Sequence, residues 1–201
     1  MDKTAIEHWS PVIGGQFWWT GLIFVLIFVP LMIFLGSKIS SKQRDMVLYG
    51  MGIYQLGNKA LTQIGYIFSD NYIMASNLPL HLCGLSGILA GIVVFYRKQI
   101  LFEFLYFFGL VGFIHSVLTP EFTGGVSSWK IFDYYVGHSM LIIIPVWLMK
   151  YYEFRLRHNA WWTSFIYLQL IVVLVSQANS IIGNGANSVS YTHLRAHETN
   201  S

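Results

Sequence analysis

The sequence predicts an all-α polytopic membrane protein with six transmembrane helices and its N-terminus outside. Hydrophobic residues make up 55% of the 201 residues and charged residues only 10%, against roughly a quarter charged in an ordinary soluble domain. Such a composition cannot supply the hydrated surface of a soluble domain of this size. The net charge of +3 and the single Cys also exclude a nucleic-acid-binding protein and a disulfide-stabilised scaffold.

Six apolar runs are long enough to cross a bilayer as helices. A hydrocarbon core about 30 Å thick needs about 20 residues of helix, and lipid offers unpaired backbone groups no hydrogen-bond partners. The pattern also lacks the alternation of a transmembrane β-barrel. The spans are expected at residues 17–35, 46–68, 73–96, 100–118, 131–149 and 160–182.

The first three runs differ in their polar character. The first holds no charge and lies too far from the N-terminus for a typical cleaved signal peptide. The second carries Lys59 and Gln63 at spacings that place polar side chains on one helical face, which must turn toward the bundle. The third includes Pro79, which is expected to kink the helix and to free a backbone carbonyl near His81.

The last three runs are apolar with few ionisable or amide groups. The fourth carries His115 near its outer end and Glu103 near its inner end. Glu103 lies beside the basic residues 97 and 98, so an interfacial ion pair with them is expected. The fifth run carries His138 and the sixth carries Asn179.

Successive loops are alternately rich and poor in basic residues, so most basic side chains lie on one side of the predicted bundle, and this sets its orientation. Short loops rich in Lys and Arg normally lie on the cytoplasmic side. The first, third and fifth loops hold eight basic residues, namely Lys38, Lys42, Arg44, Arg97, Lys98, Lys150, Arg155 and Arg157. The opposite side holds Lys3 and Lys130. The N-terminus and the end of the sixth span are therefore both expected on the outer side of the membrane.

Composition changes abruptly after Ser188. Residues 189–199 read VSYTHLRAHET, which resembles one reading frame of the transposase adapter used to build sequencing libraries. We therefore interpret residues 189–201 as an adapter-derived artefact and leave them out of the predicted fold. On this interpretation residues 1–188 form a single six-helix membrane domain, and the natural C-terminus is missing.

Polar groups from five spans are expected to meet at one depth, in the outer half of the membrane. A rise of 1.5 Å per residue places Cys83 and His138 about 10–15 Å below the outer surface of the hydrocarbon core. Ionisable groups at such depth normally face an interior or a water-filled cavity. The residues expected around this cavity are Lys59, Gln63, His81, Cys83, His115, Tyr134, His138 and Asn179.

A Cys with a His at the same depth suggests thiol nucleophilic catalysis. His81 and Cys83 are two residues apart, so about 200° separates them around a regular helix. The expected partner of Cys83 is therefore His138 on the fifth span. Tyr134, one turn before His138, is in place to fix the tautomer of the imidazole.

Structural explanations stay open for several of these residues. A membrane His is often only a hydrogen-bonding contact between helices, and this applies to His115 in particular. Lys59 pairs with Asp133 or snorkels outward on the structural reading, and Cys83 alone would be a small buried hydrophobe. A metal site ranks lower, because the carboxylates of Asp133 and Glu121 lie too near the surface to complete one.

Four segments resemble a known family. They are residues 78–83 (LPLHLC), 109–120 (GLVGFIHSVLTP), 135–139 (YVGHS) and 179–184 (NSIIGN). In this order they resemble the YwaF-type bacterial integral membrane family, over nearly all of residues 10–187. That family is related to eukaryotic transmembrane protein 164, which resembles the androgen-induced membrane hydrolases.

The resemblance implies a lipid acyltransferase or hydrolase-type enzyme of the bacterial plasma membrane. Such an enzyme moves a fatty acyl chain between phospholipids through a Cys nucleophile and a His. Residue by residue, Cys83 matches the nucleophile and His138 the base. The expected partners are membrane lipids, and no soluble cofactor is expected.

Two other classes of function remain open. The first is a non-enzymatic carrier or permease, in which the Lys59 and Gln63 face binds a small polar solute. The second is a membrane anchor whose polar groups are purely structural. An enzyme requires the Cys83 thiol, whereas a carrier tolerates Cys83→Ala and loses function on Lys59→Ala.

Overall fold

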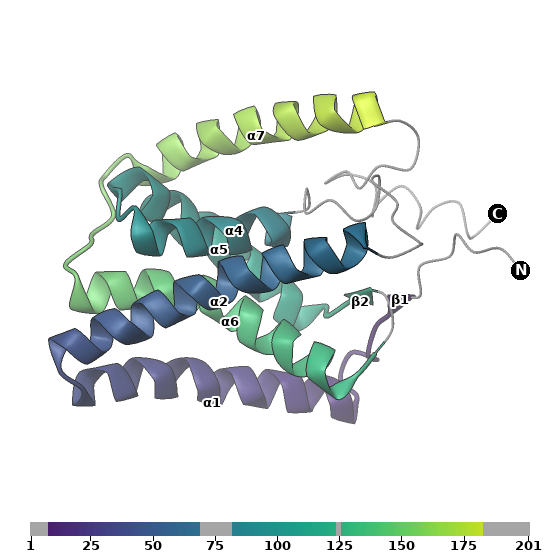
Figure 1. Ribbon diagram of the computed structural model, residues 1–201, viewed down its shortest axis with the longest axis horizontal. Coiled ribbons are helices and arrows are strands. Elements are labelled where there is room, and N and C mark those ends of the chain that lie inside the picture. The colour runs from purple at the N-terminus through teal and green to yellow at the C-terminus, as the bar shows by residue number, and fades with distance from the viewer. Residues whose placement is uncertain (1–7, 69–81, 124–125, 183–201) are drawn as a thin grey trace, which may run out of the picture.

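The computed structural model describes residues 8–68, 82–123 and 126–182, which form a bundle of α-helices (Figure 1). The helices in these residues are α1 (Gln16–Lys38), α2 (Ser41–Ile67), α4 (Leu82–Phe95), α5 (Gln99–Leu118), α6 (Ser128–Tyr151) and α7 (Ala160–Ile182). Two short strands, β1 (His8–Trp9) and β2 (Phe122–Thr123), pair antiparallel. The predicted all-α class is confirmed, and the strand pair is a small addition to it.

Four of the described helices are long and apolar enough to cross a membrane. They are α1, α5, α6 and the Ala160–Ala178 part of α7. The apolar part of α4 is shorter, and residues 73–81 of the predicted third span lie outside the described residues. In α2, charged and amide side chains are spread along the whole helix. The four long apolar helices make the chain a multi-pass membrane protein.

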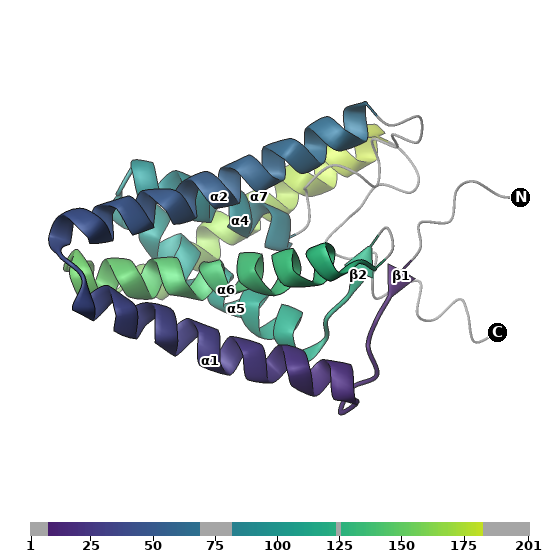
Figure 2. The ribbon, with the colours of Figure 1, turned by 60° about the horizontal axis from the view of Figure 1, so that its bottom comes forward.

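The helices run back and forth along one bundle axis. The connections α1–α2, α4–α5 and α6–α7 lie at one end, and the strand pair lies at the other (Figure 1). Between them α6 runs through the middle of the bundle (Figure 2), where it contacts α1, α2, α4 and α5. The last helix, α7, packs against α5.

The central place of α6 follows from its sequence. Apolar residues surround its axis instead of forming one stripe, as expected for a helix buried on all sides. Its buried apolar side chains are Tyr135, Val136, Met140, Leu141, Ile143, Ile144, Trp147 and Leu148. Packing at close range holds such helices together in lipid. At Gly109 of α5, a Cβ atom would lie 2.7 Å from the Leu141 carbonyl oxygen, so glycine allows the two helices to touch.

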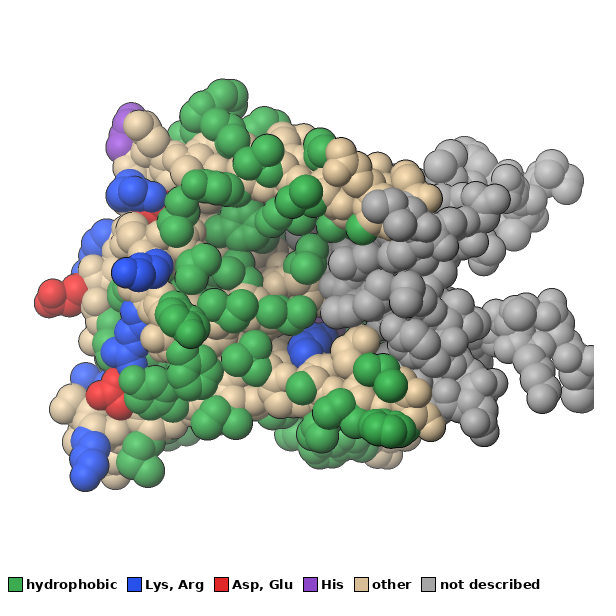
Figure 3. Space-filling view, turned by 45° about the horizontal axis from the view of Figure 1, so that its top comes forward, with side chains coloured by type: hydrophobic (Ala, Val, Ile, Leu, Met, Phe, Trp, Pro, Cys, Tyr) green, Lys and Arg blue, Asp and Glu red, His purple; other side chains and the backbone are tan. Residues whose placement is uncertain are grey.

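Lys and Arg side chains gather at the end where the three helix connections lie (left in Figure 3). There Arg97 Nη2 donates to Asp45 Oδ1 at 3.1 Å, and its guanidinium lies 4.5 Å from the centre of the Tyr152 ring. The Tyr152 hydroxyl donates to the same carboxylate oxygen at 2.7 Å. This Asp45 cluster (Asp45, Arg97 and Tyr152) ties α2 to the residues that follow α4 and α6.

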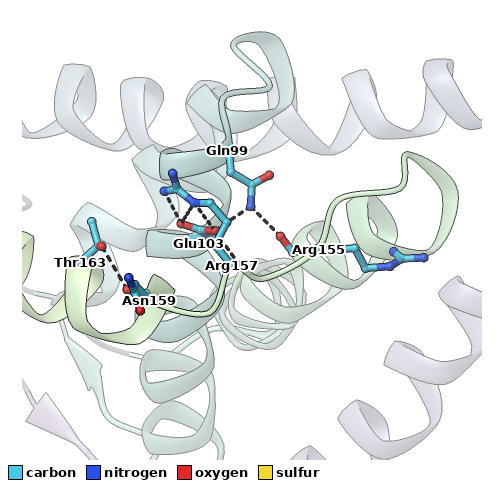
Figure 4. A network of polar contacts seen from close by, with 6 residues as sticks. All are labelled: Gln99, Glu103, Arg155, Arg157, Asn159 and Thr163. Carbon is cyan, nitrogen blue, oxygen red and sulfur yellow. Dashed lines mark hydrogen bonds and ion pairs between the residues drawn. The ribbon is translucent and has the colours of Figure 1, made fainter.

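Glu103 of α5 is only 1% exposed and pairs with Arg157, not with residues 97 and 98 as expected (Figure 4). Arg157 donates from Nη2 to Oε2 at 2.7 Å, from Nε to Oε1 at 2.9 Å and from its backbone N–H to Oε1 at 3.0 Å. The expectation was wrong because the loop after α6 folds back onto α5. A buried carboxylate requires such full pairing, so this contact fixes the α6–α7 loop.

Aromatic side chains close the opposite end of the bundle. Phe122 of β2 is 3% exposed, and its ring centre lies 5.5 Å from that of Trp9 on β1. The same ring lies 4.6 Å from that of Tyr134 at the start of α6. The strand pair therefore helps to fix the position of Tyr134.

Acid should weaken the Asp45 cluster. The Tyr152 hydroxyl and the Arg97 guanidinium hold the pKa of Asp45 below its ordinary value of 3.8, because both stabilise the charged carboxylate. The cluster therefore contributes stability that is fully present above pH 3.8 and is lost as the pH falls through the lower folded-state pKa. When the pH is lowered below 3.8, we expect the thermal unfolding midpoint in detergent to fall, and to fall less in Asp45→Asn.

Glu153→Gln is the matched control, because Glu153 is an exposed carboxylate in the same end of the bundle. Its acid response should equal that of the unaltered protein. An Asp45→Asn variant with the full acid response would contradict the stabilising role of the cluster.

Candidate functional site

The polar face of α2 turns into the bundle and meets α6. Asn58 Nδ2 lies 2.8 Å from each carboxylate oxygen of Asp133, and the Tyr54 hydroxyl donates to Oδ1 of the same carboxylate. Gln55, which is 2% exposed, donates from Nε2 to the Gly137 carbonyl oxygen at 2.8 Å. In an apolar bundle these groups must find partners inside the protein, as the sequence indicated.

Lys59 lies one position beyond Asn58 and reaches toward α4. A Cβ atom on Gly87 of α4 would lie 3.0 Å from Lys59 Cε and 3.9 Å from Nζ. The lysine stem therefore passes α4 where that helix has no side chain. Its ammonium lies within electrostatic range of the Asp133 carboxylate and of the Cys83 thiol. Whether Lys59 pairs with Asp133 or snorkels outward stays a prediction.

Cys83 is the single Cys of the chain and lies half-buried on α4. A Cβ atom on Gly112 of α5 would lie 3.7 Å from its sulfur and 3.7 Å from Leu141 Cδ1 of α6. The thiol also interacts electrostatically with Lys59 and with Tyr134. Residues from α2, α5 and α6 therefore surround this part of α4.

His138 is held by Tyr134, one turn earlier on α6. Its Nδ1 lies 2.7 Å from the Tyr134 backbone oxygen, and the two ring centres are 4.2 Å apart. Because a carbonyl oxygen can only accept, Nδ1 carries the hydrogen, and the neutral imidazole keeps its lone pair on Nε2. This tautomer can accept a proton at Nε2.

Tyr134 joins several parts of the site. Its hydroxyl donates to the Ser116 carbonyl oxygen at 3.1 Å and accepts from the Glu121 backbone N–H at 3.4 Å. These contacts tie α6 to the end of α5 and to the following loop. The ring of His138 packs on that of Tyr134, and the Cys83 thiol lies within electrostatic range of the Tyr134 hydroxyl.

The described contacts bring neither His138 nor the remaining predicted residues to the thiol, so the pairing of Cys83 with His138 stays a prediction. His115 is exposed in the last turn of α5, and its backbone carbonyl accepts from Thr119. Gln63 is half-buried on α2. His81 lies outside the described residues, as does the side chain of Asn179 on α7. Their place around a cavity stays a prediction.

Sequence analysis missed Tyr54 and Asn58 as members of the site. Their four-residue spacing is a signal that could have placed both on one face of α2. Asp133 was considered as a partner of Lys59 and set aside only as a metal ligand, and it accepts the hydrogen bonds of both residues. Within the described residues, no group of three His, Cys, Asp or Glu side chains could hold a metal ion.

A comparison with known protein families identifies the family of this chain. The model of the TMEM164 family matches residues 7–201. The chain belongs to the TMEM164 family. No curated protein and no solved structure matches it. Residues 189–201, interpreted above as adapter-derived, fall within the match to the TMEM164 family and outside the described residues.

Removing the Asp133 carboxylate should destabilise this TMEM164 family member. Asp133→Ala leaves the Tyr54 hydroxyl and the Asn58 amide without their acceptor, which should cost about 1–3 kcal/mol of unfolding free energy. Asp133→Asn keeps one acceptor oxygen and should lose less. Unfolding in a mixed-micelle titration with denaturing detergent measures both losses, and an Asp133→Ala variant of unaltered stability would contradict this contact.

Proposed function

We propose that this TMEM164 family member is a lipid acyltransferase or hydrolase-type enzyme, with Cys83 as nucleophile and His138 as base. The observation that carries the proposal is the hydrogen bond at His138 Nδ1, which leaves Nε2 as the basic nitrogen. A thiol needs such a base, because the thiolate is the form that attacks a carbonyl carbon. The two side chains lie on helices that contact each other, α4 and α6, which supports their pairing.

The proposed reaction begins when His138 Nε2 takes the proton of the Cys83 thiol. The thiolate attacks the ester carbonyl carbon of a phospholipid, a C–S bond forms and the ester C–O bond breaks. The leaving lysophospholipid oxygen takes the proton from His138. A second lipid hydroxyl or water then attacks the thioester, gives its proton to His138 and releases the acyl product, and the thiolate regains a proton. Only an acyl group and protons move, so no soluble cofactor is required.

The proposed substrates follow from the proposed membrane arrangement. All six helices cross a bacterial plasma membrane with the N-terminus outside, as in the YwaF-type family that the sequence resembles. The end rich in Lys and Arg (Figure 3) then faces the cytoplasm. Cys83 and His138 lie in the outer half of the membrane, where phospholipids of the outer leaflet are the acyl donors.

A carrier or permease for a small polar solute is the second candidate function. The half-buried Lys59 on the polar face of α2 favours it, because charged groups inside membrane bundles often mark a solute pathway. A carrier has no need of the thiol, so Cys83→Ala would keep its activity.

Trapping the acyl intermediate tests the proposed function. The full chain, in lipid nanodiscs with labelled phospholipid, should gain an acyl adduct that hydroxylamine removes and that intact-mass spectrometry detects. The single Cys makes the position of a thioester unambiguous. The adduct should be absent in Cys83→Ala and should form at least about tenfold more slowly in His138→Ala, because general bases contribute factors of this order or more.

His158→Ala is the matched control, because His158 is exposed in the loop between α6 and α7. It should form the adduct at the unaltered rate. Absence of an adduct with every phospholipid class tested, or an adduct that persists in Cys83→Ala, would contradict the proposed function.

A further inference from the structure

Lys59 is a charged group within the bundle that the proposed reaction does not use. It is half-buried on α2 and lies within electrostatic range of groups on α4 and α6. An ammonium group in an apolar bundle is costly and usually serves a function. Attachment of α2 to α6 does not account for it, because Gln55 and Asn58 already supply hydrogen bonds between these helices.

The Lys59 side chain reaches the face of α4 that carries Cys83. Gly87, whose Cβ position lies 3.0 Å from Lys59 Cε, follows Cys83 by four residues and therefore lies on the same helical face. A side chain at position 87 would force the end of the lysine side chain to shift by at least a few tenths of an ångström. The absence of one lets the ammonium approach α4 close to the thiol.

The ionisable groups around the thiol come from two neighbouring helices. Lys59 of α2 and Tyr134 of α6 lie within electrostatic range of it. Asp133 interacts with Lys59, and His138 packs on Tyr134. Among the described residues, Lys59 is the one Lys or Arg in electrostatic contact with Cys83.

We propose that Lys59 stabilises the Cys83 thiolate, and that Gly87 keeps open the space through which the lysine reaches it. This inference deepens the proposed acyl transfer and rests on it for its role in catalysis. When His138 takes the thiol proton, the negative charge on Sγ faces the Lys59 ammonium. Lys59 keeps its protons throughout, forms no covalent bond, and has the Asp133 carboxylate as its counter-charge.

The reactivity of the thiol tests this role without any lipid turnover. The full chain in detergent micelles without phospholipid is treated with N-ethylmaleimide, a small neutral reagent, and intact-mass spectrometry follows alkylation of the single Cys. Because only the thiolate reacts, Lys59→Gln should slow alkylation at about pH 8 by about 3- to 10-fold. Lys59→Arg keeps a positive charge and should restore most of the rate.

A change in access to the thiol must be separated from a change in its charge. Methyl methanethiosulfonate, a smaller neutral reagent, should show the same ratio between the unaltered protein and Lys59→Gln. Equal alkylation rates for these two proteins, or a loss in Lys59→Arg as large as in Lys59→Gln, would overturn the proposal. A rate ratio between the unaltered protein and Lys59→Gln that differs between the two reagents would also overturn the proposal.

Gly87→Ala tests the same proposal with the lysine retained. The added methyl carbon would lie 3.0 Å from Lys59 Cε, so the lysine end must shift by a few tenths of an ångström, and alkylation should slow by less than in Lys59→Gln. Gly57→Ala is the matched control, because a Cβ atom at Gly57 of α2 meets nothing within 4 Å. Equal rates for Gly87→Ala and Gly57→Ala would overturn the part assigned to Gly87. Because alkylation needs no phospholipid, these results stand apart from the acyl-adduct experiment.

Discussion

The polar side chains of α2 need hydrogen-bond partners inside an apolar bundle, and the arrangement of the site follows from the partners that they find. Lipid offers these side chains no hydrogen-bond partners, so the protein must supply them. The Asp133 carboxylate and the Gly137 carbonyl oxygen of α6 do so. These contacts fix which side of α2 faces the bundle, and they direct Lys59 toward α4 and Cys83. The site therefore arises from hydrogen-bond pairing between helices.

The central helix α6 serves both packing and chemistry, in different parts of its length. Residues such as Ile144 and Trp147 lie in the apolar core toward the basic end. That end is held by the buried Glu103 and its partner from the following loop (Figure 4). Toward the aromatic end, the same helix carries Asp133 and His138. Rigid packing at one end thus supports a polar cluster at the other.

Much of the fold follows from the sequence, because apolar runs and basic loops are local signals. The helix α5 (Gln99–Leu118) matches the expected span 100–118 closely. Contacts between helices were harder to predict, because the rotation of one helix against another is not encoded in spacing. Asp133 was therefore left out of the site, and Glu103 was assigned the wrong partner because the path of the α6–α7 loop back onto α5 has no local signal. The hydrogen bond between His138 Nδ1 and the Tyr134 carbonyl oxygen lies within one helix, where a four-residue spacing is a local signal.

The proposed chemistry requires that Cys83 on α4 and His138 on α6 lie next to each other, and a crosslink between the two positions tests this. The His138→Cys variant carries two thiols, since the unaltered chain has a single Cys. Mild oxidation, or a short reagent that joins two thiols, should link the two positions within one chain. Leu26→Cys is the control, because Leu26 is 63% exposed on α1 and should give no such link. Intramolecular crosslinking of His138→Cys alone is the predicted result. Equal crosslinking in both variants, or none in His138→Cys, would contradict the pairing.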